Sequence, residues 1–366
     1  MPAYDAFLLV SFGGPEAPGD VMPFLENVTR GRGVPPERLV AVAEHYYAVG
    51  GVSPINQQCR DMLTAVQAEF VAGGLSLPVY WGNRNWSPYL TDTVRAMAED
   101  GVRRAIAFVT SAYSSYSSCR QYLDDIERAR AAVGPDAPQI DKIRRFFNHP
   151  GFIEPFAANA AAALATLPAE TREDAHLVFT AHSIPVAMAD ASGPGGGRRY
   201  VAELTEAARL IAERTDGGSH PWTLAYQSRS GPPSQPWLEP DVRDHLAELA
   251  KSGTQAVVVV PAGFVSDHME VRHDLDVEAA ETADGLGLAF ARAATPGTSP
   301  RFASMITELV RERMAQPEGT QPERTQPERT QPEGTVPDTT VSDNPALGDM
   351  GVPSQTCPAD CCGGRR

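Results

Sequence analysis

Short apolar runs alternate along this chain with longer amphipathic segments of helical period. Runs of this length that are bounded by glycine and polar residues predict buried strands. Strands that alternate with helices are typical of parallel α/β sheets. The predicted strands cover residues 6–11, 79–81, 105–109, 140–143, 177–179, 223–226, 256–260 and 288–291.

The predicted strands fall into two similar halves. We therefore expect an α/β fold with domains at residues 1–150 and 151–315, each a parallel sheet of about four strands flanked by helices. Polar or glycine-bearing segments follow nearly every predicted strand. Because ligands of open α/β sheets bind beyond the carboxyl ends of the strands, these segments are expected to face one crevice between the domains.

The composition changes sharply after about residue 315. Five-residue repeats of the form Gln-Pro-Glu-(Gly/Arg)-Thr run from Gln316 to Thr335 without an apolar anchor. Because these repeats offer no core residues and proline removes backbone donors, residues 316–356 are expected to form a disordered linker. The linker leads to a cysteine-rich tail at residues 357–366.

Charge and composition exclude several classes of partner. The net charge of −15 argues against nucleic-acid binding, which needs clustered Lys and Arg, and against attraction to anionic lipid. No apolar run reaches the length of a membrane span, and a strand-like run begins directly after Asp5, which leaves no room for a signal peptide. The five cysteines are an odd number, so a disulfide framework is not expected, and a cytoplasmic location is.

His182 follows the predicted strand at 177–179, in the segment Thr180-Ala-His-Ser-Ile-Pro185. A neutral imidazole at a strand's carboxyl end can bind a divalent metal or accept a proton. Pro185 restricts the residue before it and favours a rigid turn that would fix the ring. A histidine in this position can also be purely structural, and its position alone does not decide between the two interpretations.

Three carboxylates, Glu270, Asp274 and Glu278, follow the predicted strand at 256–260 at intervals of four residues. If the chain from 269 to about 283 is helical, they lie above one another on one face, where like charges weaken the helix. A bound or passing cation would offset the repulsion, and His182 beside Glu270 would make a metal-handling site. The alternative is a solvated helix face, although such faces usually include lysine at this spacing and this one has none.

Aromatic residues are few, at 7%, yet many lie in the predicted crevice segments. Several of them together would suit a large, flat, apolar ligand. Arg30 and Arg84 could pair with carboxylates of such a ligand, because a guanidinium group matches carboxylate geometry. The glycine-rich segment 193–197 lacks the lysine of a phosphate-binding loop and is interpreted as a flexible loop.

Taken together, the segments resemble the ferrochelatase family, which inserts ferrous iron into porphyrins, and specifically its actinobacterial branch. The resemblance runs in order from residue 4 to about residue 313. The matching segments are Leu8-Leu-Val-Ser-Phe-Gly-Gly-Pro15, Arg30-Gly-Arg32, Gly50-Gly-Val-Ser-Pro-Ile55, Gly82-Asn-Arg-Asn-Trp86, Thr180-Ala-His-Ser-Ile-Pro185, Tyr226-Gln-Ser-Arg-Ser-Gly-Pro232, Pro236-Trp-Leu238 and Gly263-Phe-Val-Ser-Asp-His-Met-Glu270.

The resemblance implies two Rossmann-like, chelatase-type domains that enclose a porphyrin cleft. It implies that His182 and Glu270 bind the metal and handle protons, and that Asp274 and Glu278 continue a metal path to the surface. The residues implied to contact the porphyrin and its propionates are Arg30, His45, Tyr46, Ser53 and Tyr122.

The branch implies coproporphyrin III as substrate and Fe-coproporphyrin III (coproheme) as product, within heme biosynthesis and beside other enzymes of that pathway. Alternatives are protoporphyrin IX as the substrate and a non-catalytic tetrapyrrole or metal carrier on the same fold. A third is a cobalt or nickel chelatase, which usually places one histidine from each half on the metal, and only His45 is comparable in the first half. The sequence does not fix the oligomeric state.

Two positions depart from Gram-positive relatives. Phe12 stands where they carry a tyrosine that ligates iron axially, so that role is lost or moved, and Asn85 stands where they place a histidine.

The resemblance also implies a 2Fe–2S cluster held by one internal and three C-terminal cysteines, which here are Cys119, Cys357, Cys361 and Cys362. The alternative is a disordered tail whose thiols hold no cluster. Cys59 is interpreted as a small core residue.

Overall fold

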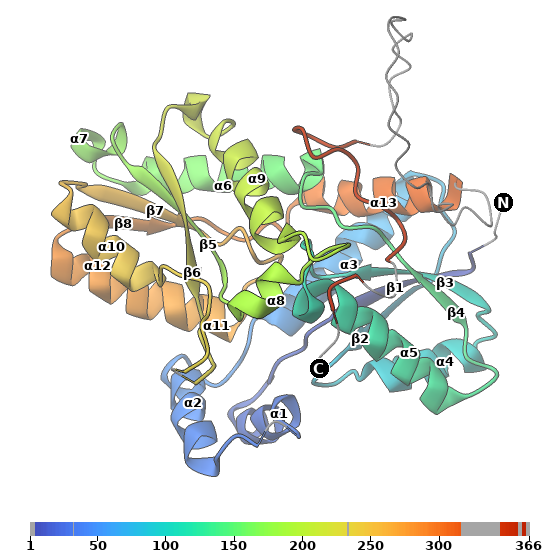
Figure 1. Cartoon of the computed structure of the whole chain (residues 1–366). Coiled ribbons are helices and arrows are strands. Elements are labelled where there is room, and N and C mark those ends of the chain that lie inside the picture. Colours follow the sequence, from blue (N-terminus) through green and yellow to red (C-terminus); the bar gives the residue numbers. More distant parts are fainter. Residues whose placement is uncertain (1–3, 32, 233, 316–344, 358–360, 364–366) are drawn as a thin grey trace, which may run out of the picture.

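The computed structural model describes residues 4–31, 33–232, 234–315, 345–357 and 361–363. Its framework is two sheets of four parallel strands each (Figure 1). The first has the order β2-β1-β3-β4, with β1 at Ala6–Ser11, β2 at Val79–Asn83, β3 at Arg104–Val109 and β4 at Gln139–Lys142. The second has the order β6-β5-β7-β8, with β5 at His176–His182, β6 at Trp222–Gln227, β7 at Ala256–Val260 and β8 at Ala289–Arg292. The predicted strands and the α/β class are confirmed.

Helices fill the connections, as right-handed parallel crossovers require. The α-helices are α1 (Val21–Val28), α2 (Pro36–Ala48), α3 (Ile55–Ala72), α4 (Leu90–Glu99), α5 (Gln121–Val133), α6 (Pro150–Thr166), α7 (Ala169–Arg172), α8 (Val186–Asp190), α9 (Arg199–Ala212), α10 (Val242–Lys251), α11 (Met269–Val271), α12 (Ala280–Leu286) and α13 (Pro300–Ala315). The short 3₁₀ turns are η1 (Pro18–Asp20) and η3 (Asp216–Gly218). Two segments have π-helical hydrogen bonds, η2 (Tyr116–Arg120) and η4 (Arg272–Ala279).

The part built on the first sheet is the first lobe, and the part built on the second sheet is the second lobe. One apolar core runs through both, because Phe108 of β3 and Val258 of β7 belong to the same buried cluster. Helix α13 joins the lobes by packing against α3 and against α6. Its Phe302 ring makes an edge contact with Phe108, with the ring centroids 6.0 Å apart. The last helix of the predicted second domain thus also packs on the first lobe.

Hydrogen bonds also fix the lobes to each other close to the carboxyl ends of the strands. The hydroxyl of Tyr113, in the segment after β3, donates to the carbonyl of Ala262 after β7 at 2.7 Å. The backbone N–H of Asp267 donates to Oε1 of Gln58 on α3 at 2.8 Å. The segments that follow β3 and β7 are therefore held in a defined relation to each other.

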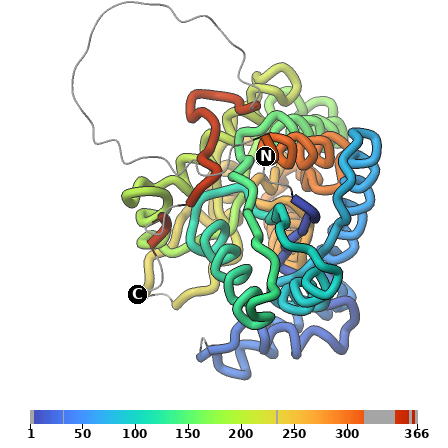
Figure 2. Tube along the Cα trace, turned by 90° about the vertical axis from the view of Figure 1, so that its right-hand side faces the viewer, coloured from blue at the N-terminus to red at the C-terminus, as the bar shows by residue number. Residues whose placement is uncertain are grey.

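Residues 345–357 lie against the body of the protein instead of continuing the predicted linker (Figures 1 and 2). The backbone N–H of Leu347 donates to the carbonyl of Asn148 at 2.8 Å, and the Asn148 amide donates back to the Leu347 carbonyl at 3.2 Å. We call residues 345–357 the docked segment. The repeats within residues 316–344 lie outside the described residues.

A buried ion pair lies under the docked segment. Arg144, whose side chain is fully buried, donates to Glu312 of α13 at 2.7 and 2.9 Å. Gln355 of the docked segment donates to the same Glu312 carboxylate at 2.6 Å. A further hydrogen bond to a buried ion pair offsets part of the free-energy cost of removing the two charges from water. The hydrogen bond from Gln355 to Glu312 therefore anchors the docked segment.

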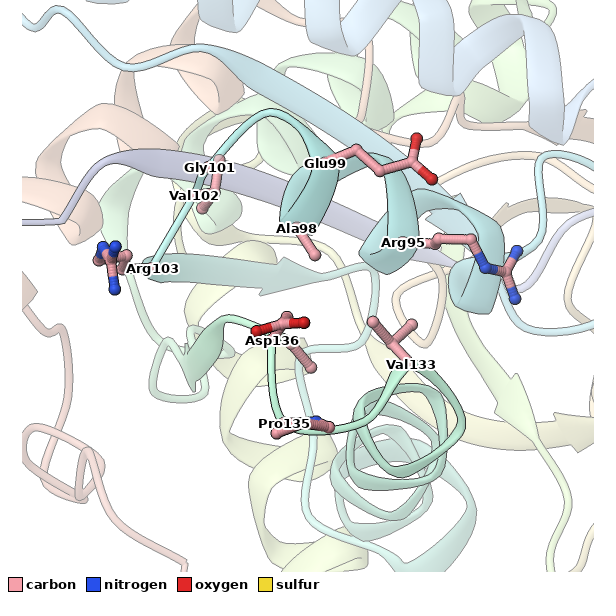
Figure 3. A pocket seen from close by; sticks show the side chains of 10 residues that line it. Arg95, Ala98, Glu99, Gly101, Val102, Arg103, Val133, Pro135 and Asp136 are labelled. Atoms are coloured by element: carbon pink, nitrogen blue, oxygen red, sulfur yellow. The ribbon is translucent and has the colours of Figure 1, made fainter.

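The hollow drawn in Figure 3 lies away from the carboxyl ends of the strands. It has a volume of about 600 Å³ and is lined by residues such as Glu99, Arg103 and Asp136. These residues precede β3 and β4, at the edge of the sheet opposite the one where such folds bind ligands. Among the residues with described placement, no helix is both long and apolar enough to cross a membrane.

Candidate active site

His182 is the last residue of β5, and its ring is held in one orientation. Its Nδ1 lies 2.5 Å from the carbonyl oxygen of Ser183, which can only accept a hydrogen bond. Nδ1 therefore carries the proton, and Nε2 presents a free lone pair. The hydroxyl of Tyr200 donates to the backbone carbonyl of His182 at 2.8 Å and fixes the strand end. A histidine held in this way is oriented to bind a metal or accept a proton.

Glu270 lies opposite the free nitrogen of His182. The distance from His182 Nε2 to Glu270 Oε2 is 3.6 Å, and both side chains are open to solvent, at 33% and 50% exposure. Gly263 makes this approach possible, because a Cβ there would lie 2.6 Å from Cα of Ala181. The segment after β7 can therefore pass directly beside the end of β5. The structure brings together the two residues that the sequence proposed as a pair.

The helical segment that carries the carboxylates differs from the expected α-helix. It begins as α11, continues as the π-helix η4 and ends as α12. Such π segments are rare and frequently occur at functional sites. Asp274, in η4, accepts hydrogen bonds from the hydroxyl of Ser228 and, at 3.3 Å, from the amide of Gln227. Both donors belong to β6 and the residue after it, so a third strand end contributes to the site.

The Asp274 carboxyl has a perturbed acidity. Its pKa is raised from 3.8 to about 6, by burial first and then by the negative charges of Glu270 and Glu278, against the opposing hydrogen bond from Ser228. A raised pKa from both desolvation and like charges is typical of functional carboxylates. A divalent cation beside the three carboxylates would offset the repulsion between their charges.

The first lobe reaches this site through α2. Burial raises the pKa of the Tyr46 hydroxyl, and the negative charges of Glu270 and Asp274 add to the effect. The ring of His45 stacks on that of His273, with centroids 4.0 Å apart. The candidate site thus lies between the lobes, as the sequence predicted.

An aromatic wall stands on the first lobe next to α2. Phe24 makes ring contacts with Phe12, Tyr46 and Trp86 at centroid distances of 6.1–6.4 Å, and Trp86 contacts Tyr89. Phe12, directly after β1, is 37% exposed. An open aromatic surface of this kind suits the face of a large planar ligand.

The other predicted substrate residues are placed differently from one another. Arg30, shortly after α1, is exposed, whereas Ser53 and Tyr122 are buried in the first lobe.

The interpretation of Arg84 as a ligand-binding arginine is corrected. Its guanidinium forms a largely buried ion pair with Asp125 and lies 4.6 Å from the centroid of the Tyr122 ring. Because the Arg84 guanidinium is already paired with the Asp125 carboxylate, we do not expect it to bind a carboxylate of the ligand.

Four cysteine thiols form a second cluster, away from the carboxylates. The thiol of Cys119, in η2 of the first lobe, interacts with that of Cys357 of the docked segment, and the Cys357 thiol interacts with that of Cys361. The Sγ atoms of Cys361 and Cys362 are 3.7 Å apart. Three of the four are almost fully buried. The structure thus brings the internal cysteine and the three C-terminal cysteines into one group.

The surroundings favour the thiolate, which is the form that binds metal, at Cys357 and Cys362, whereas the pKa values of Cys119 and Cys361 are raised. Hydrogen bonds from Cys119 and then Cys361 lower the pKa of Cys357, and the charges of Lys142 and Arg120 add to this. A hydrogen bond from Cys361 lowers the pKa of Cys362 to about 7.

The backbone N–H of Gly193 also donates to Sγ of Cys362, at 3.2 Å. Gly193 belongs to the glycine-rich segment that sequence reasoning took for a flexible loop. Gln227 and Ser228, which hold Asp274, were also missed, although they lie in a segment that follows a predicted strand. The available signal for these residues was their position near the end of a strand or helix. Glycine, glutamine and serine do not by themselves indicate contacts with Cys362 or Asp274.

Comparison with known proteins agrees with this geometry. The family model described as Ferrochelatase matches residues 4–314. A coproporphyrin III ferrochelatase of Streptomyces coelicolor is 52% identical, over 99% of this chain and 94% of that protein. A coproporphyrin III ferrochelatase of Nocardia farcinica is 59% identical over 85% and 89% of the two chains, and a ferrochelatase of Rhodopirellula baltica is 49% identical over 99% and 94%.

A solved structure, SirB from Bacillus subtilis with Fe³⁺, has a TM-score of 0.51 at 11% identity, covering 86% of this chain and 96% of that one. At this identity the likeness concerns the fold, and it supports the chelatase-type arrangement of the two sheets. The extent of the family match and the identity to the relatives decide the assignment: the chain belongs to the ferrochelatase family.

Proposed function

We propose that this protein inserts ferrous iron into coproporphyrin III, forming Fe-coproporphyrin III in heme biosynthesis, and that it does so in the cytoplasm. The observation that carries the proposal is the free Nε2 of His182 facing Glu270 across 3.6 Å, between the lobes. The proposal for the porphyrin also rests on the names of the relatives in Streptomyces coelicolor and Nocardia farcinica.

The residues of the site have three roles in the reaction: they bind the porphyrin, deliver the iron and accept the pyrrole protons. The aromatic wall holds one face of the porphyrin, and the carboxylates of Glu278, Asp274 and Glu270 pass the iron inward. The porphyrin loses two pyrrole protons as the two iron–nitrogen bonds that replace them form. His182 Nε2 accepts the first proton, because its lone pair is free and Nδ1 is already protonated. Glu270, which is open to solvent, accepts the second proton and releases it to water.

The substrates differ in charge, because coproporphyrin III carries four propionates and protoporphyrin IX carries two. Arg30 is exposed at the end of α1, where a guanidinium can pair with a propionate. His45 and Tyr46 on α2 would border the same edge of the ligand. Ser53 and Tyr122 are buried, and we propose that they support the cleft from beneath.

We also propose that Cys119, Cys357, Cys361 and Cys362 hold a 2Fe–2S cluster. The support is the contact between the four thiols and the cations beside them, including Arg145, whose pKa is affected by three of these cysteines. When bound, such a cluster accepts or releases one electron. The residues themselves would tie η2 of the first lobe to the docked segment and to Gly193 of the second lobe.

The central test is anaerobic turnover with ferrous iron, preceded by a visible spectrum of the purified protein. Conversion of the free-base bands of coproporphyrin III, faster than those of protoporphyrin IX, is expected. Binding of both porphyrins without any conversion would instead identify a tetrapyrrole carrier. A purified protein without the visible absorption of an iron–sulfur cluster would refute the cluster.

A further inference from the structure

Two buried asparagines lie behind the aromatic wall, where the first sheet meets α3. Asn83 is the last residue of β2, Asn56 is the second residue of α3, and both are fully buried. Nδ2 of Asn83 donates a hydrogen bond to Oδ1 of Asn56 at 3.3 Å. Gly13, after β1, makes room for this pair, because its φ is +81° and a Cβ there would lie 2.8 Å from Cβ of Asn83. We call the two side chains the amide bridge.

Every polar atom of the amide bridge has a hydrogen-bond partner. Nε1 of Trp81 donates to Oδ1 of Asn83 at 3.0 Å. Nδ2 of Asn83 also donates to the carbonyl of Ser87 at 3.1 Å. Nδ2 of Asn56 donates to the carbonyls of Gly14 and Ser87, at 3.2 and 3.3 Å. A primary amide has two N–H donors and a carbonyl acceptor, so both amides are fully used, and a buried network in this state is rigid.

The carbonyls that accept from the amide bridge belong to the two segments that carry rings of the aromatic wall. Gly14 lies two residues after Phe12, and Ser87 directly follows Trp86. The same two segments are joined to each other, because the backbone N–H of Asn85 donates to the carbonyl of Phe12 at 3.1 Å. The amide bridge therefore fixes the separation of the two segments from behind.

The rings of the wall depend on that separation. Phe24 of α1 makes edge contacts with Phe12 and with Trp86, at centroid distances of 6.4 and 6.1 Å. Phe24 is itself buried, so it supports both rings from the core. A shift of one segment against the other would tilt one ring relative to its neighbour. A surface that already has its bound geometry loses less entropy when a ligand binds, so fixed rings favour affinity.

We propose that Asn56 and Asn83 are positioning residues for the porphyrin, because they fix the two segments that carry Phe12 and Trp86. The inference rests on the proposed function and deepens it, since it identifies what prepares the first lobe for a planar tetrapyrrole. Both amides are buried, so they act on the ligand through the wall. Their loss should lower porphyrin affinity and leave iron insertion at saturating porphyrin largely unchanged.

The test is a fluorescence titration of the full-length protein with coproporphyrin III, without iron. Asn83→Ala should raise the dissociation constant by about tenfold, because the buried partners of its amide are left unsatisfied and the segment after β2 shifts. Asn56→Ala provides the same measurement from the α3 side if Asn83→Ala does not fold.

The matched control is Asn148→Ala. Asn148 is also fully buried, and its amide donates to the carbonyls of Leu347 and Gly351 in the docked segment, which lies apart from α1 (Figure 1). Its loss removes comparable hydrogen bonds without touching the wall. The dissociation constant for coproporphyrin III should therefore change by less than about twofold.

The two amides should act as one unit. They share the Ser87 carbonyl and one hydrogen bond, so their effects are not expected to add. The double variant Asn56→Ala with Asn83→Ala should weaken binding by about tenfold, and not by the roughly hundredfold product of two independent losses. A loss close to that product would overturn the shared bridge.

A measurement without porphyrin separates this inference from the proposed function. In protein labelled with fluorotryptophan, the fluorine resonance of Trp86 is assigned with Trp86→Phe. It should shift or broaden in Asn83→Ala and keep its position in Asn148→Ala. An unchanged Trp86 resonance in Asn83→Ala, or an unchanged porphyrin affinity, would overturn the positioning role. Failed iron insertion by wild-type protein that still binds porphyrin would refute the proposed function alone.

Discussion

The two lobes share a strand order, yet corresponding strands end in different chemistry. The central strand β1 of the first lobe is followed by Phe12, whereas the corresponding strand β5 ends in His182. The segment after β3 leads to Cys119, and the segment after β7 leads to Glu270. The first lobe thus contributes an apolar wall and one thiol, while the second contributes the proposed metal-handling groups.

This contrast shows what the fold determines and what it leaves open. A parallel sheet provides a row of strand ends that face one crevice, and the residue placed at each end decides the chemistry. The aromatic wall and the proposed metal-handling groups lie on different lobes. A planar ligand can therefore be held on one side while an ion reaches it from the other. Each prediction below breaks or refines this division.

The largest effect is expected at the paired strand ends. His182→Ala should lower iron insertion by on the order of 10²–10⁴-fold, because the free Nε2 is lost, and should leave porphyrin affinity nearly unchanged, because the aromatic wall lies on the first lobe. The matched variant Phe12→Leu should change insertion only a few-fold. Steady-state turnover and fluorescence titration with coproporphyrin III measure the two quantities. Equal losses of turnover in both variants would contradict the division between the lobes.

The next effect concerns the thiol that the first lobe contributes. Cys119→Ser should abolish the iron–sulfur absorption and electron paramagnetic resonance signals, because one of four ligands is lost. Cys59→Ala is the control, since Cys59 is buried in α3, within the first lobe's apolar core. It should keep both signals. Spectra that survive in Cys119→Ser would show that the cluster uses other ligands.

Breaking the buried ion pair beneath the docked segment should destabilise the whole protein. Arg144→Met leaves Glu312 buried without its partner, and we expect the free energy of unfolding to fall by about 3–5 kcal/mol. The double variant Arg144→Met with Glu312→Leu removes both charges and should recover much of this loss. Urea denaturation followed by circular dichroism measures it. A double variant no more stable than the single one would mean that packing, and not the unpaired charge, is responsible.

A smaller effect of opposite sign is expected at Asp274. Its pKa is raised from 3.8 to about 6, so the folded state holds the proton more tightly than the unfolded chain does. The resulting stability is present below pH 3.8 and is lost as the pH rises through about 6. Asp274→Asn should therefore stabilise the protein at pH 7.5 by up to about 3 kcal/mol, and this gain should vanish near pH 4.

The neighbouring Asp276 provides the contrast for that measurement. Asp276 is paired with Arg292 of β8, so Asp276→Asn should destabilise the protein at neutral pH. Metal-free protein in a chelating buffer is used for both variants, because a bound cation would favour the charged form of Asp274. Loss of stability in Asp274→Asn at pH 7.5 would contradict the proposed cause of its raised pKa.

The strands could be predicted because they are short, apolar and separated by glycine or polar residues, and the pairing of His182 with Glu270 followed from their places after β5 and β7. The π-helix could not be predicted, because its hydrogen bonds differ from those of an α-helix by one residue and the apolar pattern fits both. The stacking of His45 on His273 depends on how α2 crosses the second lobe. Periodicity within either segment carries no information about that crossing.

The docked segment could not be predicted for a different reason. Leu347 and Met350 pack against the core, and polar contacts such as Gln355 to Glu312 hold the rest, but these few residues among prolines and glycines leave no periodic pattern. Arg84 was misread because its partner Asp125 is distant in sequence.

The placement of the cysteines has a consequence for how the protein matures. Three of the four thiols follow both lobes in the sequence, so they are synthesised after both sheets. Any shortened product that ends before Cys357 retains both sheets but only one of the four thiols. The colour of the proposed iron–sulfur group would therefore distinguish molecules that retain the three C-terminal cysteines from shortened ones in the same preparation.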